Sequence, residues 1–344
     1  MKTLVINRPD DWHVHLRDGE LLQHTVAATA THFGRALVMP NLTPALTNLS
    51  AIDAYRKRII AAVPDNCSFV PYMTFYLNEA VITAELEKAA GLPYVLGAKF
   101  YPAGATTNSD SGAKSLKVLY PILEVLQENN LTLQIHGEVT HGDIFEREAL
   151  FITDYLKPLI DDFPRLNVVL EHISTREAVD FVLQAPPTVA ATITPHHLLY
   201  NRNQLLAGGI RPHYYCLPVL KHELDQKALQ QAAISGNPKF FAGTDSAPHT
   251  TQTKEHSCGC AGIYSAPYAL ALYAQTFDEL NSLDKLHHFV SHFGANFYGL
   301  PTNNEQVELV KSPQTIPSQL PLGQNKVVPV AAGETIPWSV NDLT

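Results

Sequence analysis

The sequence predicts an α/β protein built as a single (β/α)8 TIM barrel with a short C-terminal extension. Eight short apolar or β-branched runs follow one another along the chain, and longer segments with helical periodicity separate them. This alternation stops after Pro301, where proline and polar residues become frequent. Strands that alternate with helices form parallel sheets, and eight strands can close into a barrel. We therefore assign residues 1–300 to the barrel and expect residues 301–344 to pack on it.

The predicted elements follow in order along the chain. The strands cover residues 11–16, 36–41, 68–77, 97–102, 131–137, 167–173, 189–197 and 240–245. Between the fifth and sixth strands, apolar residues recur every three or four positions from residue 145 to residue 163, which predicts a helix. Ser174 and Glu177 have the spacing of a capping box, which places another helix start directly after the sixth strand. Segments 306–310 and 326–331 are predicted as edge strands or as a clasp across the barrel.

Composition excludes several classes of function. The net charge of −9 argues against a nucleic-acid surface, which needs a basic stripe. No apolar run approaches the ~20 residues that span a bilayer, and residues 1–11 resemble no signal peptide, so we expect a cytoplasmic protein without a membrane partner. Cys258 and Cys260 lack two further clustered cysteines, so we interpret them as part of a packed loop rather than a zinc site.

Histidines give the first indication of chemistry. The chain holds 16 of them, and His13 and His15 lie two positions apart in the first predicted strand. Residues i and i+2 of a strand point to the same side, so both imidazoles face the barrel axis, where they can bind one Zn²⁺. For this pair alone, hydrogen-bonded strand histidines are the more common explanation. The other strand ends decide between the two.

Metal-binding or titratable side chains end most of the other predicted strands. In a (β/α)8 barrel these ends meet at one mouth, where the active site lies. Each residue alone is more often structural, since a lone Asp is often a helix N-cap and a lone His is often hydrogen-bonded in the core. Their joint occurrence favours a metal site. The residues are Asn41, Lys99, His136, His172, His197 and Asp245.

Nine segments around these residues resemble the dihydroorotase family of the amidohydrolase superfamily, in its short bacterial type. The resemblance spans nearly the whole chain in order. The position of His13 near the start fits this type, because longer relatives carry half of a β-sandwich before the first barrel strand. The segments are 10–19, 39–42, 99–103, 136–141, 171–173, 201–203, 211–213, 243–249 and 258–262.

This resemblance implies two zinc ions per chain, joined by a CO2-derived carbamate on Lys99. Two neighbouring cations favour the neutral amine over the ammonium, and a neutral amine can capture CO2. The common alternative is a lysine whose stem lines the barrel and whose ammonium reaches solvent. Asp245 would transfer the proton during the reaction. The implied ligands are His13, His15, Lys99 and Asp245 for one zinc, and Lys99, His136 and His172 for the other.

The implied reaction is the reversible, zinc-dependent cyclisation of N-carbamoyl-L-aspartate to (S)-dihydroorotate and water, the third step of de novo pyrimidine biosynthesis. The substrate carboxylate needs a cationic partner. Arg17 shares the strand parity of His13 and His15 and offers a bidentate fork, although an arginine just past a strand is more often a surface charge. The resemblance supplies the remaining substrate contacts, namely the side chains of Asn41, His136 and His249 and the backbone of Leu217 and Ala261.

Residues 103–113 directly follow the strand that carries Lys99. Their composition alone favours an ordinary flexible loop, but their place beside the metals favours a lid. The resemblance supports the lid through Thr106 and Thr107, and it also implies a homodimer. We expect four further histidines to be structural or to support the site, without a choice among these roles: His141, His196, His197 and His213.

Two other classes of function compete with this interpretation. A hydantoinase is expected to lack the carboxylate partners Arg17, Asn41 and His249, and an aminohydrolase typically binds one zinc and lacks the bridging Lys99. A catalytically inactive scaffold of the same fold, acting as an assembly partner, is expected to have lost metal ligands. The sequence retains all of them.

Overall fold

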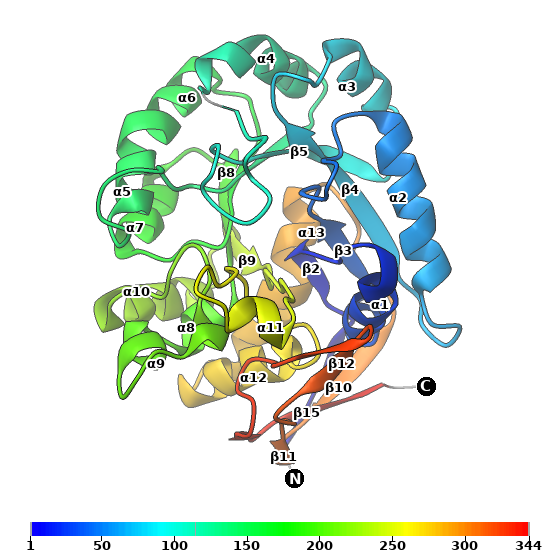
Figure 1. Ribbon diagram of the computed structural model, residues 1–344, viewed down its shortest axis with the longest axis vertical. Helices are drawn as coiled ribbons and strands as arrows, with labels where there is room; N and C mark the ends of the chain where they lie inside the picture. Colours follow the sequence, from blue (N-terminus) through cyan, green and yellow to red (C-terminus); the bar gives the residue numbers. More distant parts are fainter. Residues whose placement is uncertain (1, 114, 343–344) are drawn as a thin grey trace.

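Eight parallel strands surround the centre of the molecule (Figure 1) in this computed structural model, which describes residues 2–113 and 115–342. Each strand pairs with the next one along the chain. The barrel closes where the chain beyond the last strand meets the first, since Asp245 N donates to His13 O (2.8 Å) and His15 N donates to Ser246 O (3.1 Å). The predicted barrel is confirmed. The strands are β2 (Asp10–Val14), β3 (Arg35–Val38), β4 (Val70–Leu77), β5 (Val95–Phe100), β6 (Thr132–Ile135), β7 (Val168–Leu170), β8 (Val189–Ile193) and β9 (Phe240–Ala242).

All eight predicted strands are present, but most of them end earlier than predicted. The backbone leaves the extended conformation at His172 (φ 42°) and Asp245 (φ 44°), so these residues lie in the loops beyond β7 and β9. His197 is a clear error, because it lies within the short helix α8 and not at a strand end. Thr194 accepts a hydrogen bond from His197 N and Pro195 follows at the first turn, so this helix begins directly after β8.

Helices pack around the outside of the barrel (Figure 1). Among the described residues, no helix is long and apolar enough to cross a membrane. The α-helices are α1 (Leu22–Ala30), α2 (Leu49–Ala62), α3 (Thr83–Ala89), α4 (Tyr120–Glu128), α5 (Arg147–Phe151), α6 (Lys157–Asp162), α7 (Arg176–Gln184), α8 (Pro195–Leu199), α9 (Arg202–Leu206), α10 (Glu223–Ile234), α11 (Thr251–Lys254), α12 (Ala269–Glu279) and α13 (Phe293–Phe297). Short 3-10 turns are η1 (Gly19–Leu21), η2 (Lys117–Leu119), η4 (Pro212–Tyr214) and η5 (Leu283–Lys285), and π turns are η3 (Ile152–Leu156) and η6 (His288–His292).

The helix predicted over residues 145–163 is confirmed as a continuous stretch formed by α5, the π turn η3 and α6. The start of α7 is also confirmed, but its predicted cap is wrong. Thr175, and not Ser174, is the N-cap, and its hydroxyl accepts from Ala178 N. Glu177 is therefore one position short of the place that a capping box requires.

The end of the barrel opposite the mouth is filled by large side chains. Trp12 of β2, Tyr72 of β4 and Phe241 of β9 belong to one buried cluster, against which residues of α13 pack. Trp12 also stacks on Tyr298, with ring centroids 4.7 Å apart. A Cβ on Gly294 would lie 2.0 Å from the Trp12 ring, so this close approach needs glycine. The packing closes this end and leaves the C-terminal ends of the strands as the only mouth that the described barrel offers.

The C-terminal segment forms three small antiparallel sheets, one of which includes the start of the chain. The strand β10 (Gln306–Val310) lies between β1 (Thr3–Asn7) and β15 (Ser339–Asp342), so segment 306–310 is a strand as predicted but a central one rather than an edge. The second predicted segment contributes β13 (Asn325–Val327), which pairs with β12 (Leu320–Leu322). The remaining pair is β11 (Gln314–Thr315) with β14 (Thr335–Ile336). The division of the chain at residue 301 stays a prediction.

Candidate metal centre

Two histidines and one aspartate meet at the mouth of the barrel. Asp245 Oδ1 lies 3.1 Å from His15 Nε2 and 3.5 Å from His13 Nε2. The three side chains are buried, and their donor atoms lie within 4.8 Å of one another, as the ligands of a single metal ion do. His15 Nδ1 donates to Asn41 Oδ1 at 2.8 Å, which leaves the His15 Nε2 lone pair directed toward Asp245. This arrangement presents the neutral tautomer that metals bind.

A second group of side chains lies directly beside the first. The ring centroid of His172 is 4.9 Å from that of His13 and 4.9 Å from that of His136. Lys99 of β5 is completely buried and lies close enough to His136 and His172 for its charge to lower their pKa values. Within the described part of the chain, Lys99 Nζ, His172 Nδ1 and His13 Nε2 have no hydrogen-bond partner. Buried polar atoms rarely lack partners in folded proteins, so this set of nitrogen donors fits bound metal.

Burial keeps His15, His136 and His172 neutral at physiological pH. It lowers the pKa of His15 to about 4, and it lowers the pKa values of His136 and His172, the latter also through Lys99. Burial also lowers the pKa of Lys99 to about 8, against the opposing effect of nearby carboxylates. For Asp245, burial acts to raise the pKa, but the close contacts with His15 and His13 outweigh this effect and hold the pKa below its usual range. Neutral imidazoles and an ionised carboxylate are the metal-binding forms.

Three buried carboxylates support the site, and the sequence analysis assigned none of them a role. Glu171 Oε2 lies 2.9 Å from His13 Nδ1, and Glu138 Oε2 accepts a hydrogen bond from His136 Nε2 at 3.0 Å. Asp11 accepts from His13 N at 3.2 Å and from Thr244 N at 2.8 Å, which joins β2 to the segment after β9. A carboxylate behind a metal-binding histidine fixes the orientation of its ring. Their position in the sequence could have indicated this role, since Glu171 directly precedes the predicted ligand His172 and Glu138 follows His136 by two positions.

One narrow cavity joins the metal-donor cluster to the predicted substrate residues. In this cavity, Arg17 Nη2 donates to His249 Nε2 at 2.9 Å and Arg17 Nε donates to Pro248 O at 3.1 Å. Arg17 has a positive φ of 58°, so its backbone turns sharply just past β2. The cavity is lined by His15, Arg17, Asn41, Tyr101, Thr106, Thr107, His136, Leu217, Asp245, Ala247, Ala261 and Gly262.

The segment predicted as a lid folds over this cavity as a compact loop. Thr107 Oγ1 donates to Ala261 O at 3.2 Å, and Thr107 O accepts from Asn41 Nδ2 at 3.1 Å. Within the loop, the buried Ser109 hydroxyl accepts from Thr106 N and donates to Thr106 O. Asn41 therefore links the loop to His15, a role that the sequence analysis did not foresee.

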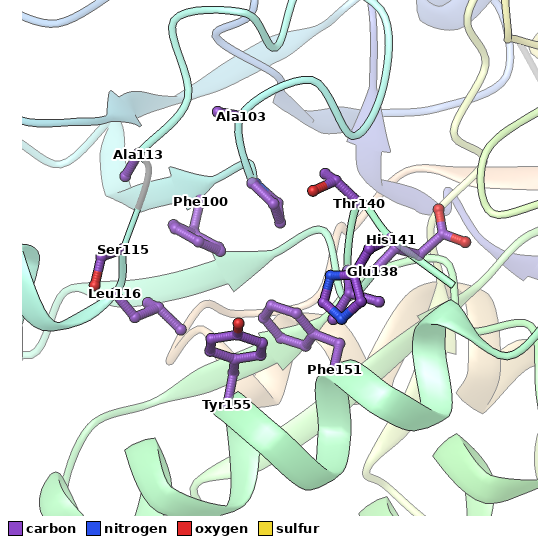
Figure 2. A pocket seen from close by; sticks show the side chains of 12 residues that line it. Phe100, Ala103, Ala113, Ser115, Leu116, Glu138, Thr140, His141, Phe151 and Tyr155 are labelled. Carbon is purple, nitrogen blue, oxygen red and sulfur yellow. The ribbon is translucent and has the colours of Figure 1, made fainter. Parts of the chain in front are cut away.

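A larger cavity lies beside the mouth (Figure 2), but it is not the metal centre. It has an empty volume of about 660 Å³ and is lined by apolar side chains, among them Phe100, Phe151 and Tyr155. His141 also lines it and is not among the residues that line the narrow cavity at the metal donors. Glu138 is shared between this cavity and the site, because its carboxylate holds His136.

His197 and His213, two of the histidines without an assigned role, are held by hydrogen bonds. His197 Nδ1 accepts from Thr194 Oγ1 (2.8 Å), and its Nε2 donates to Pro218 O (3.1 Å), so its ring is engaged in structure. Cys216 Sγ donates to the same carbonyl. In the buried group formed by His196, His197 and Cys216, two of the three candidate metal ligands are therefore already engaged in hydrogen bonds. His213 Nε2 contacts Glu255 near the surface. All four cysteines are free thiols, including Cys258 and Cys260.

Comparison with known proteins gives consistent matches over the whole chain. The family model described as the amidohydrolase family matches residues 6–313. The dihydroorotase of Nitrosococcus oceani is 56% identical over 338 residues, which cover 98% of this chain and 98% of that protein. A dihydroorotase from Saccharomyces cerevisiae, solved in complex with 5-fluoroorotic acid, superposes with a TM-score of 0.90 at 35% identity and covers 99% of both chains. The L-hydantoinase of Arthrobacter aurescens has a TM-score of 0.81 at 16% identity, which shows a common fold alone.

Proposed function

Since the chain belongs to the amidohydrolase family, and within it to the dihydroorotases, we propose that its metal centre catalyses the reversible cyclisation of N-carbamoyl-L-aspartate to (S)-dihydroorotate and water. This reaction is the third step of de novo pyrimidine biosynthesis. One observation carries the assignment: a single cavity is lined by metal-donor residues such as His136 and Asp245 and by the cation Arg17. A cyclic amide that bears a carboxylate needs metal ligands beside its amide bond and a cation beside its carboxylate, and this cavity has both.

The family is metal-dependent, and we assign two zinc ions to the centre. The buried nitrogen atoms without partners support this count, because the six candidate ligands exceed the four that one zinc ion usually takes. When bound, zinc polarises an amide carbonyl and makes hydroxide available at neutral pH. The ligands are His13, His15, Lys99 and Asp245 for one ion, and Lys99, His136 and His172 for the other.

Lys99 would carry a carbamate and, in that form, would help to hold both ions. Its amine lies in a fully buried site, and its pKa of about 8 leaves a usable neutral fraction at physiological pH. The neutral Nζ would attack the carbon of CO2: one N–C bond forms, one C=O π bond opens and one proton passes to solvent, which gives an anion with two oxygen donors. Such an anion matches a site whose other candidate ligands are imidazoles and one carboxylate, that of Asp245.

We assign the proton transfer to Asp245. Its carboxylate is ionised at neutral pH and lies in the wall of the cavity, so it can accept a proton during ring opening and deliver it to the leaving amide nitrogen. The contact with His15 holds one carboxylate oxygen, Oδ1, on the metal side. Ring closure follows the same path in reverse.

The opposite end of the cavity binds the substrate carboxylate. The guanidinium of Arg17 is fixed by His249 and by Pro248 O, so its fork is already oriented when substrate enters. We assign Asn41 to the same carboxylate, and the backbone of Leu217 and Ala261 to the ring, because all three line the cavity. The loop 103–113 then acts as the lid, with Thr106 and Thr107 facing the bound substrate.

A substrate panel tests the function. The zinc-loaded protein should hydrolyse dihydroorotate, with a loss of its ultraviolet absorbance, and should be far slower on hydantoin and adenosine. A chelator should abolish the activity, and added zinc should restore it. Preference for hydantoin or adenosine, or full activity in the presence of the chelator, would contradict the assignment. The homodimer that the resemblance implies stays a prediction, which sedimentation can test.

A further inference from the structure

The side chain of Lys254 is buried behind the wall of the substrate cavity and donates three hydrogen bonds. It ends the short helix α11, shown in yellow in Figure 1, and is 3% exposed. Its Nζ donates to Tyr215 O (2.7 Å), to Gly262 O (2.8 Å) and to Cys260 O (2.9 Å). An ammonium has three N–H donors, so all of them are used on backbone carbonyls.

The three carbonyls belong to two separate segments that both form the cavity wall. Residues 215–217 supply Leu217, and residues 260–262 supply Ala261 and Gly262. One direct hydrogen bond, from Gly262 N to Tyr215 O (3.0 Å), also joins these segments. Lys254 therefore contributes most of the polar contacts described between them, and it bonds to both segments at once.

The same contacts orient the peptide of Ala261. Lys254 holds the carbonyls on either side of this residue, those of Cys260 and Gly262. The Ala261 carbonyl has a different partner, Thr107 Oγ1 of the lid segment, at 3.2 Å. The ammonium thus fixes the peptides that flank Ala261, while the Ala261 carbonyl stays available to the lid.

We propose that Lys254 is a positioning residue, which sets the separation of wall segments 215–217 and 260–262 and thereby the affinity of the site for its ring-shaped substrate. The inference rests on the proposed function, because it takes dihydroorotate as that substrate. It does not place Lys254 in contact with substrate or metal. Burial of an ammonium costs free energy, and it lowers the pKa of Lys254 to about 8. If Lys254 served packing alone, an apolar side chain would fill the same space without this cost.

The test compares two methionine variants in the zinc-loaded protein. Lys254→Met keeps the length of the side chain and removes its donors. The matched control is Lys239→Met, because Lys239 Nζ also donates to two backbone carbonyls, those of Val182 and Ala185, but lies directly before β9 at the end of the barrel opposite the mouth. The readouts are kcat and KM for dihydroorotate, the Kd for 5-fluoroorotic acid, and zinc per chain.

For Lys254→Met we expect KM and Kd to rise by about tenfold or more, as loss of hydrogen bonds to a charged group allows, with kcat and zinc content near those of the wild type. Lys239→Met should leave all four quantities unchanged. Unchanged KM and Kd in Lys254→Met, or an equal rise in Lys239→Met, would overturn the proposal. If Lys254→Met does not fold, Lys254→Gln, which retains two N–H donors, should show a smaller rise of KM and Kd. Unchanged KM and Kd in Lys254→Gln would then overturn the proposal. Failure of the wild type to hydrolyse dihydroorotate would instead refute the proposed function.

Discussion

His172 and Asp245 show what single residues contribute beyond their chemical identity. Both have positive φ values, of 42° and 44°, which non-glycine residues rarely adopt and which cost of order 1–3 kcal/mol. The turns direct these side chains across the mouth immediately after β7 and β9. Their presence was predictable from sequence, because metal-binding residue types recur at strand ends. The strained backbone was not, since it depends on contacts such as that of His172 N with Thr192 Oγ1.

Substitution of Lys99 tests the bridge at the residue scale. Lys99→Ala should lose at least one zinc ion per chain and most of the activity, because the carbamate on Lys99 is the ligand that we assign to both ions. Lys99→Arg should fare no better, since a guanidinium does not form a carbamate. Metal analysis, kinetics, and NMR of protein loaded with ¹³C-bicarbonate measure these effects. Wild-type turnover in Lys99→Arg would show that no carbamate is required.

Substitution of Arg17 tests the carboxylate end of the cavity. Lys keeps the charge but cannot reproduce the fork that now bonds His249 and Pro248 O. Arg17→Lys should raise KM for dihydroorotate about 10- to 100-fold, which corresponds to ~1.5–3 kcal/mol for a charged hydrogen bond. Dihydrouracil has the same ring without the carboxylate and serves as the control substrate. An equal loss of kcat/KM on both substrates would remove Arg17 from this role.

At the scale of elements, the strand order was more predictable than the strand ends. Periodicity located all eight strands, but it placed His197 at the end of β8 because the apolar run continues into α8. The buried carboxylates Glu138 and Glu171 were missed for a related reason. An acidic residue beside a predicted ligand is equally compatible with a surface loop until the fold buries it.

The loop 103–113 carries the prediction at this scale. Thr106→Ala with Thr107→Ala should slow turnover of dihydroorotate, since each lost hydrogen bond to a charged substrate costs ~1.5–3 kcal/mol. Zinc content and thermal stability should stay near wild type, because the loop keeps its internal bonds through Ser109. The test measures the turnover rate, the zinc content and the melting temperature of the double variant and the wild type on the same preparations. Normal turnover in the double variant would reduce the segment to an ordinary loop.

The whole molecule depends on contacts that sequence patterns do not encode. The barrel closes through backbone bonds between the segment after β9 and β2, and the small sheet joins β1 to β10 and β15 from the other end of the chain. Composition and periodicity predicted the barrel and the set of candidate ligands. They did not predict the pairing of the two chain ends or the packing of α13 beneath Trp12, because these contacts are distant in sequence and have no local signal.

Stability of the metal-free protein should fall as the pH is lowered from 6.5 toward 4. Burial lowers the pKa of His197 to about 4, against the opposing hydrogen bond to Pro218 O. In the unfolded chain the pKa is near 6.5, so the unfolded state takes up the proton first, and up to about 3 kcal/mol of stability is lost across this interval. Urea unfolding of the wild type and of His197→Gln at several pH values measures the effect. Equal pH dependence in both proteins would contradict it.

The central claim is that a binuclear zinc centre at the barrel mouth carries the dihydroorotase activity. The direct measurement is a zinc titration of the metal-stripped protein, in which bound zinc per chain and the initial rate of dihydroorotate hydrolysis are determined on the same samples. We expect the rate to reach its maximum at about two zinc ions per chain, as the two groups of buried donors imply. Full activity with one zinc ion per chain, or no hydrolysis with two, would contradict the account.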